Sequence, residues 1–345
     1  MRSRSPEPAE PRGPLSASVR AVLTGEAPTG RLHKADGADA VATADPYGDD
    51  LQLALYSCYE LHYRSFAGAH PDLEWDPELL RLRGAMERRF LAALRTEVDG
   101  DDDDVDAALS ELLVEPVDGQ GPSYHLAQQG TAWQLREYVV HRSLYHLKEA
   151  DPQAWVIPRL QGQAKASLVT VQHDEYGAGR AERLHASLFG AMMVELGLDD
   201  RYGAYLDAAP AATLATVNLM SLMGLHRSLR GALVGQFATV EITSSPGSRR
   251  LVQAMERLQA GPASHRFYLE HIEADAVHEQ LLRHGVIGDL LAHEPQLAAD
   301  VVFGIRASTL LDDRQGDQLL SAWNAGRSSL RHPLVDMVAE PEVRQ

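Results

Sequence analysis

The sequence predicts an all-α protein in which a helical bundle packs around a polar centre. Apolar residues recur at helical spacing almost without interruption from Trp133 onward, whereas long strands with period-two alternation are missing. Asp76-Pro77 is a typical helix start, because proline suits the first turn of a helix. Several ionisable residues also lie within the apolar helical segments. Such residues must be satisfied where they are buried, which points to a polar interior site.

Four regions are expected along the chain. Residues 1–45 are rich in Pro, Ala, Gly and Ser and are expected to form a disordered tail. Residues 46–125 should form an N-terminal helical segment, which is the candidate interface of a homodimer. Residues 126–330 should form the main bundle, and residues 331–345 a C-terminal tail.

In the N-terminal segment the apolar pattern predicts helices over about 49–66, 77–98 and 107–114, and a loop over 115–130. Residues 99–106 are an acidic run that lacks the alternating ligand spacing of a calcium loop, so a solvated loop is expected there. The helices expected in the main bundle cover residues 132–150, 153–176, 181–196, 211–225, 227–243, 248–259, 264–284, 293–311 and 315–325. The Thr243-Ser-Ser-Pro-Gly-Ser248 stretch is expected to end the fifth of these helices.

Composition excludes several classes of function. A formal charge of -17 argues against binding to nucleic acid backbones and to anionic membrane surfaces. The single cysteine, Cys58, rules out an internal disulfide, an iron–sulfur cluster and a Cys-rich zinc site. No run approaches ~18 apolar residues, and the N-terminus lacks the apolar core of a secretory signal. We therefore expect a soluble cytoplasmic protein that binds neither nucleic acid nor membrane.

Three residues near the C-terminal end of the bundle have the spacing of a metal-binding helix face. His271, Asp275 and His278 stand at i, i+4 and i+7, so they fall on one face over two turns. Imidazole and carboxylate groups together suit transition metals such as iron. A polar helix surface is the alternative interpretation of this triplet alone.

Four further residues within helical segments complete a possible ligand set: Glu149, Glu175, His185 and Glu241. The full set holds four carboxylates and three histidines, which matches the dinuclear iron or manganese sites built inside helical bundles. Glu175 and His185 would lie ~15 Å apart along a continuous helix, too far to serve one metal centre. The helix must therefore break between them, and Gly177 and Gly179 occupy that interval.

Other ionisable residues offer alternatives. Glu137 and His141 lie one turn apart and form a possible alternative ligand pair. His146 and His226 are expected to pack between helices or to face the substrate, and Lys148 is expected to form an ion pair. The remaining acidic and histidine neighbours are expected on a solvated face or behind the ligands: His173, Asp174, Glu273 and Glu279.

The arrangement Glu149, Glu175-x9-His185, Glu241 and His271-x3-Asp275-x2-His278 resembles the haem-oxygenase-like non-haem diiron oxidases and oxygenases, also called iron-containing redox enzymes. The spacing is especially similar to the N-oxygenase domain of N-nitrosourea biosynthesis, where the residue matching Glu149 is an additional carboxylate ligand. The resemblance covers roughly residues 130–325. It implies a haem-oxygenase-like bundle with an N-terminal helical extension and seven metal ligands.

The resemblance also implies two iron ions, with manganese served equally by these ligand types, and O2 as co-substrate. The expected reaction is N-hydroxylation, desaturation or oxidative C–C cleavage of a small amine, amino-acid or fatty-acid-like substrate, with electrons from an external donor. Two alternatives remain: a non-catalytic metal-binding or interaction bundle, and a haem-degrading oxygenase, for which the acidic interior is poorly suited.

Overall fold

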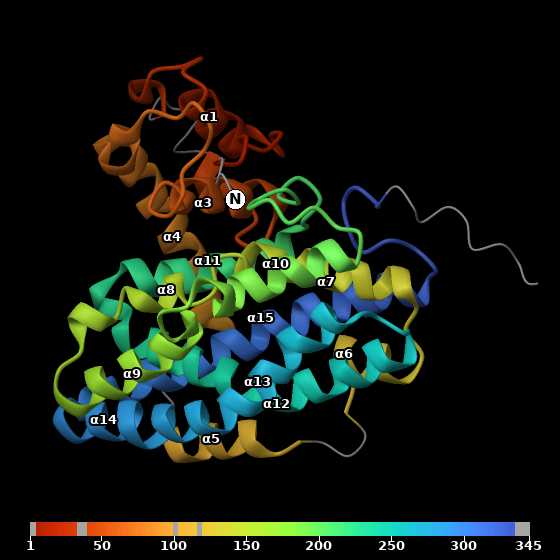
Figure 1. Cartoon of the computed structure of the whole chain (residues 1–345). Helices are drawn as coiled ribbons and strands as arrows, with labels where there is room; N and C mark the ends of the chain where they lie inside the picture. The colour runs from red at the N-terminus through yellow and green to blue at the C-terminus, as the bar shows by residue number, and fades with distance from the viewer. Residues whose placement is uncertain (1–4, 33–39, 99–102, 116–118, 335–345) are drawn as a thin grey trace, which may run out of the picture.

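Every regular element in the described part of the chain is a helix, so the all-α prediction is confirmed. The computed structural model describes residues 5–32, 40–98, 103–115 and 119–334, except for the side chains of residues 273–276. An N-terminal layer lies above a larger bundle (Figure 1). None of the described helices combines the length and the apolar run needed to cross a lipid bilayer.

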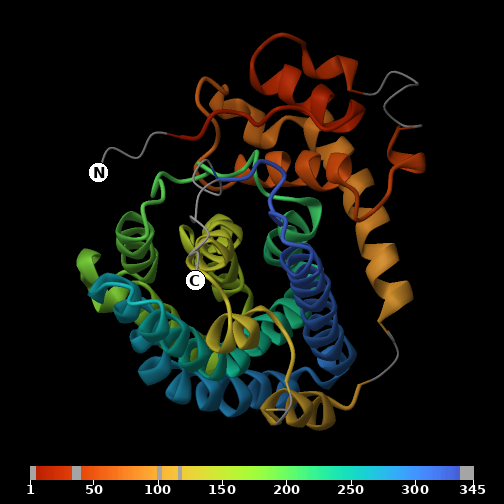
Figure 2. The same ribbon diagram turned by 90° about the vertical axis from the view of Figure 1, so that its right-hand side faces the viewer.

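The N-terminal layer consists of α1 (Pro14–Leu23), α3 (Asp49–Glu60) and α4 (Pro77–Glu97). It packs on the bundle mainly through α3, which lies against α11 (Ala211–Leu225). Asp76 caps α4 by accepting hydrogen bonds from the backbone N–H groups of Glu78 and Leu79, as the Asp-Pro start predicts. α4 then runs down one side of the bundle toward α5 (Val105–Leu113), which lies beneath the bundle (Figure 2).

The expected disordered tail over residues 1–45 is wrong where α1 forms. Leu15, Val19 and Val22 lie on one face of this helix and are buried in the main core. The Asp50 carboxylate accepts hydrogen bonds from the backbone N–H groups of Leu15, at 3.0 Å, and of Ser16, at 2.7 Å. This cap comes from the start of α3, 34 or 35 residues away, so it leaves no local signal in the Pro- and Ala-rich sequence.

The bundle is organised around α12 (Arg230–Arg257), which packs against α13 (Pro262–Gln280) on one side and α15 (Ala298–Asn324) on the other. Two glycines allow α12 and α15 to approach closely, because a Cβ at Gly235 would meet the Val301 carbonyl oxygen and one at Gly304 the Ala232 carbonyl oxygen. The other helices of the bundle are α6 (Pro122–Gln128), α7 (Ala132–His146), α8 (Asp151–Ala154), α9 (Gly162–Glu175), α10 (His185–Glu195) and α14 (Asp289–His293).

Several helix boundaries differ from the prediction. The expected turn at 243–248 lies inside α12, with Pro246 in the helix interior, and α15 is likewise one helix across the expected break at 311–315. Residues 122–128 form a helix within the expected loop. Proline is tolerated in α12 because the helix is held by tertiary packing along most of its length, with Ile242, Ser245 and Ser248 all buried.

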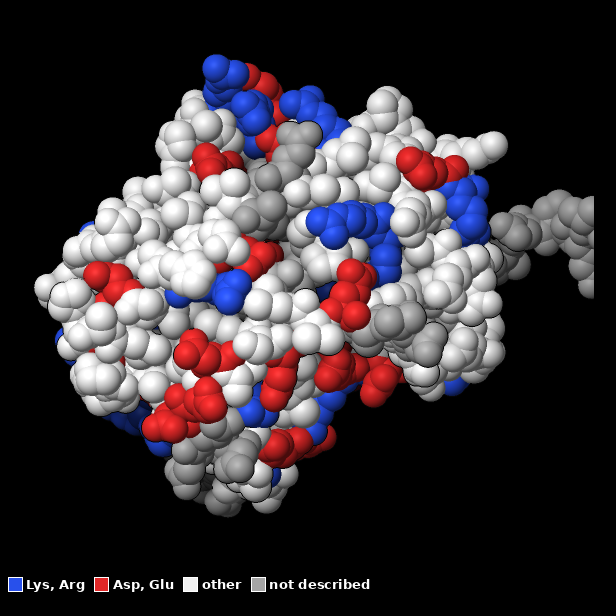
Figure 3. Space-filling view, turned by 90° about the horizontal axis from the view of Figure 1, so that it is seen from below, with Lys and Arg blue, Asp and Glu red and all other residues white. Residues whose placement is uncertain are grey.

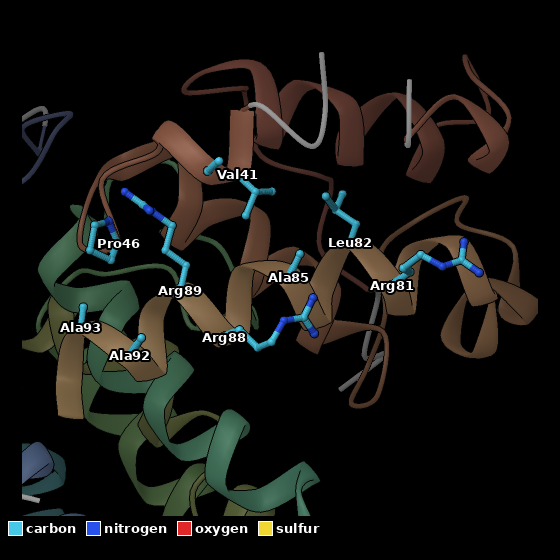
Figure 4. Close-up of a pocket in the computed structure, with 10 residues that line it drawn as sticks. Val41, Pro46, Arg81, Leu82, Ala85, Arg88, Arg89, Ala92 and Ala93 are labelled. Carbon is cyan, nitrogen blue, oxygen red and sulfur yellow. The ribbon is translucent and has the colours of Figure 1, made fainter. Parts of the chain in front are cut away.

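A groove of about 580 Å³ lies on the N-terminal layer, between α4 and residues 41–46. Its floor is apolar, with Val41 and Leu82, and the guanidinium groups of Arg81, Arg88 and Arg89 project around it (Figure 4). None of the seven predicted metal ligands lines it. Acidic side chains are spread over the lower face of the molecule (Figure 3), in keeping with the net charge of -17.

The contact between α12 and α15 gives a stability prediction. Gly304→Ala should lower the free energy of unfolding by about 1–3 kcal/mol, because the added methyl group meets the Ala232 backbone. Gly84→Ala is the matched control, since a Cβ there meets only the Arg88 guanidinium, at 3.5 Å, and alanine favours helix. Urea denaturation of both variants provides the measurement. A Gly304→Ala protein as stable as the Gly84→Ala protein would contradict the close contact.

Candidate metal centre

The structure brings together six of the seven predicted ligands in the interior of the bundle. Their ligand atoms form two groups, in each of which the atoms lie within 4.8 Å of one another. One group is Glu149, Glu175, His185 and His271, and the other is Glu175, Glu241 and His278. All six residues are buried, and Glu175 belongs to both groups. Asp275 lies outside the described side chains, so its role as a ligand stays a prediction.

The break between Glu175 and His185 is present at the place that the spacing required. Glu175 is the last residue of α9 and His185 the first of α10. The backbone between them takes positive φ angles, including +70° at Gly177. A Cβ at Gly177 would lie 2.6 Å from backbone atoms of Arg183 and Leu184, so only glycine fits this turn. The reversal leaves His185 Nδ1 2.8 Å from Glu175 Oε2.

Glu149 comes from the irregular junction between α7 and α8, because α7 ends at His146. Its Oε1 atom lies 2.7 Å from His146 Nδ1 and 3.8 Å from His271 Nε2. Its Oε2 atom is buried without a hydrogen-bond partner in the part of the chain that the structure describes. Burial raises the pKa of Glu149, but the neighbouring His146 and His271 outweigh burial and hold the pKa of this carboxyl well below its usual range. The residue is therefore a carboxylate with one oxygen available to a ligand.

The second group is centred on His278, which is fully buried. Its Nδ1 atom lies 3.0 Å from Glu241 Oε2 and 3.6 Å from Glu175 Oε1, and its Nε2 atom lies 3.3 Å from Asp174 Oδ2. Burial raises the pKa of Glu241, and the nearby Glu175 carboxylate adds to this effect while His278 opposes it. Two carboxylates and an imidazole thus compete for the same protons in a buried space, where a bound cation would stabilise both carboxylates.

His271 is oriented by its own helix. Its Nδ1–H donates to the Phe267 carbonyl oxygen at 2.8 Å, so the other ring nitrogen, Nε2, is the one that faces Glu149. Hydrogen bonds of this kind fix the tautomer and the ring orientation of metal-binding histidines. The Phe267 ring packs against the His271 ring at 4.4 Å and against the Phe189 ring at 5.1 Å between centroids. One side of the cluster is therefore an aromatic wall.

The donor set fits a transition-metal site. Among the described residues, no lysine or arginine forms an ion pair with Glu149, Glu175 or Glu241; their ion-pair partners are histidines only. Buried carboxylates that lack cationic partners are costly. Iron and related ions bind mixed sets of imidazole and carboxylate ligands, and such an ion would neutralise this charge.

The alternative pair Glu137 and His141 belongs to a separate buried network. Glu137 accepts hydrogen bonds from the Trp323 indole N–H at 3.0 Å and from the Ser329 backbone N–H at 2.9 Å. The ring nitrogens of His141 bond to Thr213 Oγ1 at 2.7 Å and to Ser329 Oγ at 2.9 Å. These residues tie the segment after α15 to α7, and neither belongs to a group of three or more clustered potential ligands among the described residues.

Two neighbours of the cluster contact its potential ligands. Asp174 was expected on a solvated face or behind the ligands, and its carboxylate, 46% accessible and 3.3 Å from His278 Nε2, is in keeping with both positions. His146 packs between helices as expected, against the rings of Phe189 and Phe267, but its contact to Glu149, the shortest that Glu149 makes, was not predicted. Its position three residues before Glu149 is a local signal that could have identified it, since residues three apart meet on a helix face. The helix ends in between, which hides this relation in the sequence.

Comparison with known proteins places this geometry in context. Residues 136–313, just over half of the chain, match a family model described as iron-containing redox enzyme, and this span contains all seven predicted ligands. The chain is also 25% identical over 239 residues to nitrosourea synthase of Streptomyces achromogenes subsp. streptozoticus. That alignment covers 67% of this chain and 50% of the relative, so this chain spans about half the length of nitrosourea synthase.

The buried His141 gives a prediction for pH dependence. Burial, with a smaller effect of Arg142, lowers the pKa of His141 from 6.5 to about 3. The folded protein therefore keeps this ring neutral, whereas the unfolded chain takes up a proton below pH ~6.5. The stability that depends on the neutral ring is complete above pH ~6.5 and is lost as the pH falls toward the folded pKa.

Between pH 6 and pH 4, the free energy of unfolding of the wild type should fall more steeply than that of His141→Gln, by about 1.4 kcal/mol per pH unit. Glutamine can still bond to Thr213 and Ser329 but does not titrate. Urea denaturation at each pH provides the measurement, and His293→Gln, on the surface, should keep the wild-type slope. Equal slopes for wild type and His141→Gln would show that the ring is not held neutral.

Proposed function

The chain belongs to the iron-containing redox enzyme family, and from this premise we propose that it is a non-haem diiron enzyme that uses O2 to oxidise a small organic substrate. The observation that carries the proposal is Glu175, which is shared by the two groups of potential ligands. A carboxylate between two neighbouring ligand groups is the arrangement expected of a residue that bridges two metal ions.

Each ion would have its own ligands in addition to Glu175. Glu149, His185 and His271 would hold one ion, and Glu241 and His278 the other, with Asp275 as a further ligand on α13. Iron is proposed in preference to manganese because the family is described as iron-containing. When bound, the two irons would supply O2 binding and electrons for its reduction.

The chain's own residues would orient the ligands and exclude water. The hydrogen bond from His271 to the Phe267 carbonyl holds one imidazole in place. The aromatic wall of Phe189 and Phe267 limits access of water to the cluster, which protects a reactive oxidant from side reactions. Glu149 stays a carboxylate beside His146, so its negative charge could balance the positive charge of a bound metal ion without a change of protonation.

We propose a small amine, amino-acid or fatty-acid-like substrate, oxidised by N-hydroxylation, desaturation or oxidative C–C cleavage. The likeness to nitrosourea synthase supports an oxidation at nitrogen among these. Haem degradation is disfavoured, because haem propionates need cationic partners, whereas the buried cluster holds three carboxylates whose ion-pair partners among the described residues are histidines only.

We further propose that the enzyme is a cytoplasmic homodimer that takes electrons from a separate donor. The exposed Trp75, with 69% of its surface accessible, and the apolar groove along α4 support an interface on the N-terminal layer.

Anaerobic loading with Fe(II) tests the metal content. We expect about two irons per chain, and rapid O2 consumption when the loaded protein is mixed with oxygenated buffer, because two adjacent ligand groups are present. Metal per chain is counted by elemental analysis and O2 uptake by an electrode, with the metal-free protein as control. Loading that saturates at one iron or none would contradict the diiron proposal.

Ligand variants test the assignment of each group. Glu175→Ala should lose both irons, because it removes the shared ligand, whereas His278→Ala should retain one iron and lose O2 consumption by more than ~100-fold. His265→Ala is the matched control on α13, since His265 bonds to the Gly261 carbonyl and lies in neither group. Circular dichroism checks that each variant remains helical. Full iron content in Glu175→Ala would refute the shared role.

A further inference from the structure

Two adjacent residues, Lys148 and Glu149, extend their side chains toward different parts of the molecule. Glu149 reaches His146 and His271 in the metal-binding cluster. Lys148 extends into the N-terminal layer, where its Nζ atom lies 3.1 Å from Glu60 Oε2 at the end of α3. The expected ion pair of Lys148 is thus present, and its partner comes from a different layer of the fold.

This ion pair is enclosed on every side that the structure describes. The side chains of Lys148 and Glu60 are 1% and 0% accessible. The Lys148 ammonium lies over the rings of Tyr63, at 4.1 Å, and Tyr56, at 5.0 Å from the centroids. The Tyr202 hydroxyl donates to Glu60 Oε2 at 2.7 Å. Because neither charge can reach water, the ammonium cannot leave Glu60 without a large energetic penalty.

A second contact joins the same two segments. The Arg64 guanidinium donates to the Leu147 carbonyl oxygen at 3.0 Å and stacks over the Tyr202 ring at 4.2 Å. The N-terminal layer therefore binds two consecutive residues, Leu147 through its backbone and Lys148 through its side chain. Both directly precede Glu149.

The backbone at this point needs such support. α7 has ended at His146, so helical hydrogen bonds do not hold Glu149, and its own N–H makes only a long bond of 3.4 Å to the His146 carbonyl. Ala150 has φ +71°, a left-handed conformation that is unfavourable for alanine and persists only where the surroundings impose it. A free junction would relax and move the Glu149 carboxylate.

We propose that the Glu60–Lys148 ion pair positions Glu149 on the metal centre, so that a contact from the N-terminal layer holds one of the metal ligands in place. This inference rests on the proposed diiron function. Glu60 is in this view a positioning residue, since it acts through Lys148 and the backbone and touches none of the six clustered ligands.

The test is an anaerobic Co(II) titration of the full-length protein, with the visible absorption of bound Co(II) reporting the coordination of each ion. In Glu60→Gln we expect one ion to bind as in the wild type and the other to bind at least roughly tenfold more weakly, as is typical when a residue that orients a ligand is removed. The absorption of the weakened ion should change as well, because Glu149 is displaced.

Asp50→Asn is the matched control. It makes the same carboxylate-to-amide change in the same layer, and Asp50 caps α1 without contacting the junction. Melting temperatures are recorded for both variants. Weaker binding of one ion in Glu60→Gln but not in an Asp50→Asn protein of equal or lower melting temperature supports positioning. Equal loss in both variants would mean that general destabilisation of the layer is responsible, which overturns it.

Two further outcomes separate this inference from the proposed function. A wild type that binds two ions, with unchanged affinities in Glu60→Gln, overturns the positioning role and leaves the diiron proposal standing. A wild type that binds fewer than two ions contradicts both the positioning role and the diiron proposal.

Should Glu60→Gln fail to fold, Tyr202→Phe is the second variant, because it removes one hydrogen bond to Glu60 and keeps both charges. It should weaken the same ion about threefold, a smaller effect typical of one hydrogen bond, and an unchanged affinity overturns the proposal.

Discussion

The constraint on which the structure depends is the burial of three glutamate carboxylates at one point inside a helical bundle. Glu149, Glu175 and Glu241 have histidines as their ion-pair partners within the described residues, at distances from 2.7 to 3.8 Å. The histidines offset part of this charge: burial raises the pKa of Glu149, but His146 and His271 hold it well below its usual range. Burial lowers the pKa of His185, but the Glu175 carboxylate outweighs burial and raises it. Under the proposed function, a bound cation would neutralise the charge that the histidines leave uncompensated. The four helices α9, α10, α12 and α13 carry Glu175, His185, Glu241 and the pair His271 and His278 to this point.

The irregular backbone of the bundle lies where this requirement conflicts with a regular helix. Glu175 and His185 meet only because the chain turns back through Gly177 and Gly179, and Glu149 reaches the cluster from a junction in which Ala150 is left-handed. A left-handed non-glycine residue costs of order 1–3 kcal/mol. Proteins retain such conformations where the surroundings impose them, often at functional sites. Both irregular segments border potential metal ligands. The turn at Gly177 packs on the nearby Arg183 and Leu184 backbone, whereas the junction before Ala150 is held by Glu60 and Arg64 of the other layer.

Sequence reasoning succeeded where the argument was geometric and local. The all-α class followed from the apolar spacing, and the break before His185 followed from a separation of ~15 Å that no continuous helix could close. It failed where a distant partner decides the outcome. The Asp50 cap of α1 and the Glu60 partner of Lys148 join residues that are remote in sequence, and Pro246 stays within α12 because tertiary packing overrides local propensity. α1 itself did leave a pattern, the spacing of Leu15, Val19 and Val22 after Pro14, but the Pro- and Ala-rich composition around it outweighed that pattern in the prediction.

The match to the family begins at residue 136, so the seven predicted ligands lie inside the matched span and the N-terminal layer lies outside it. The ion pair between Glu60 and Lys148 crosses that boundary. The helices of the matched span can therefore supply every predicted ligand, but the junction that carries Glu149 is supported by contacts from the other layer. Under the positioning role proposed for Glu60, a change at Glu60 or Lys148 would move the Glu149 carboxylate while all seven predicted ligands stay the same.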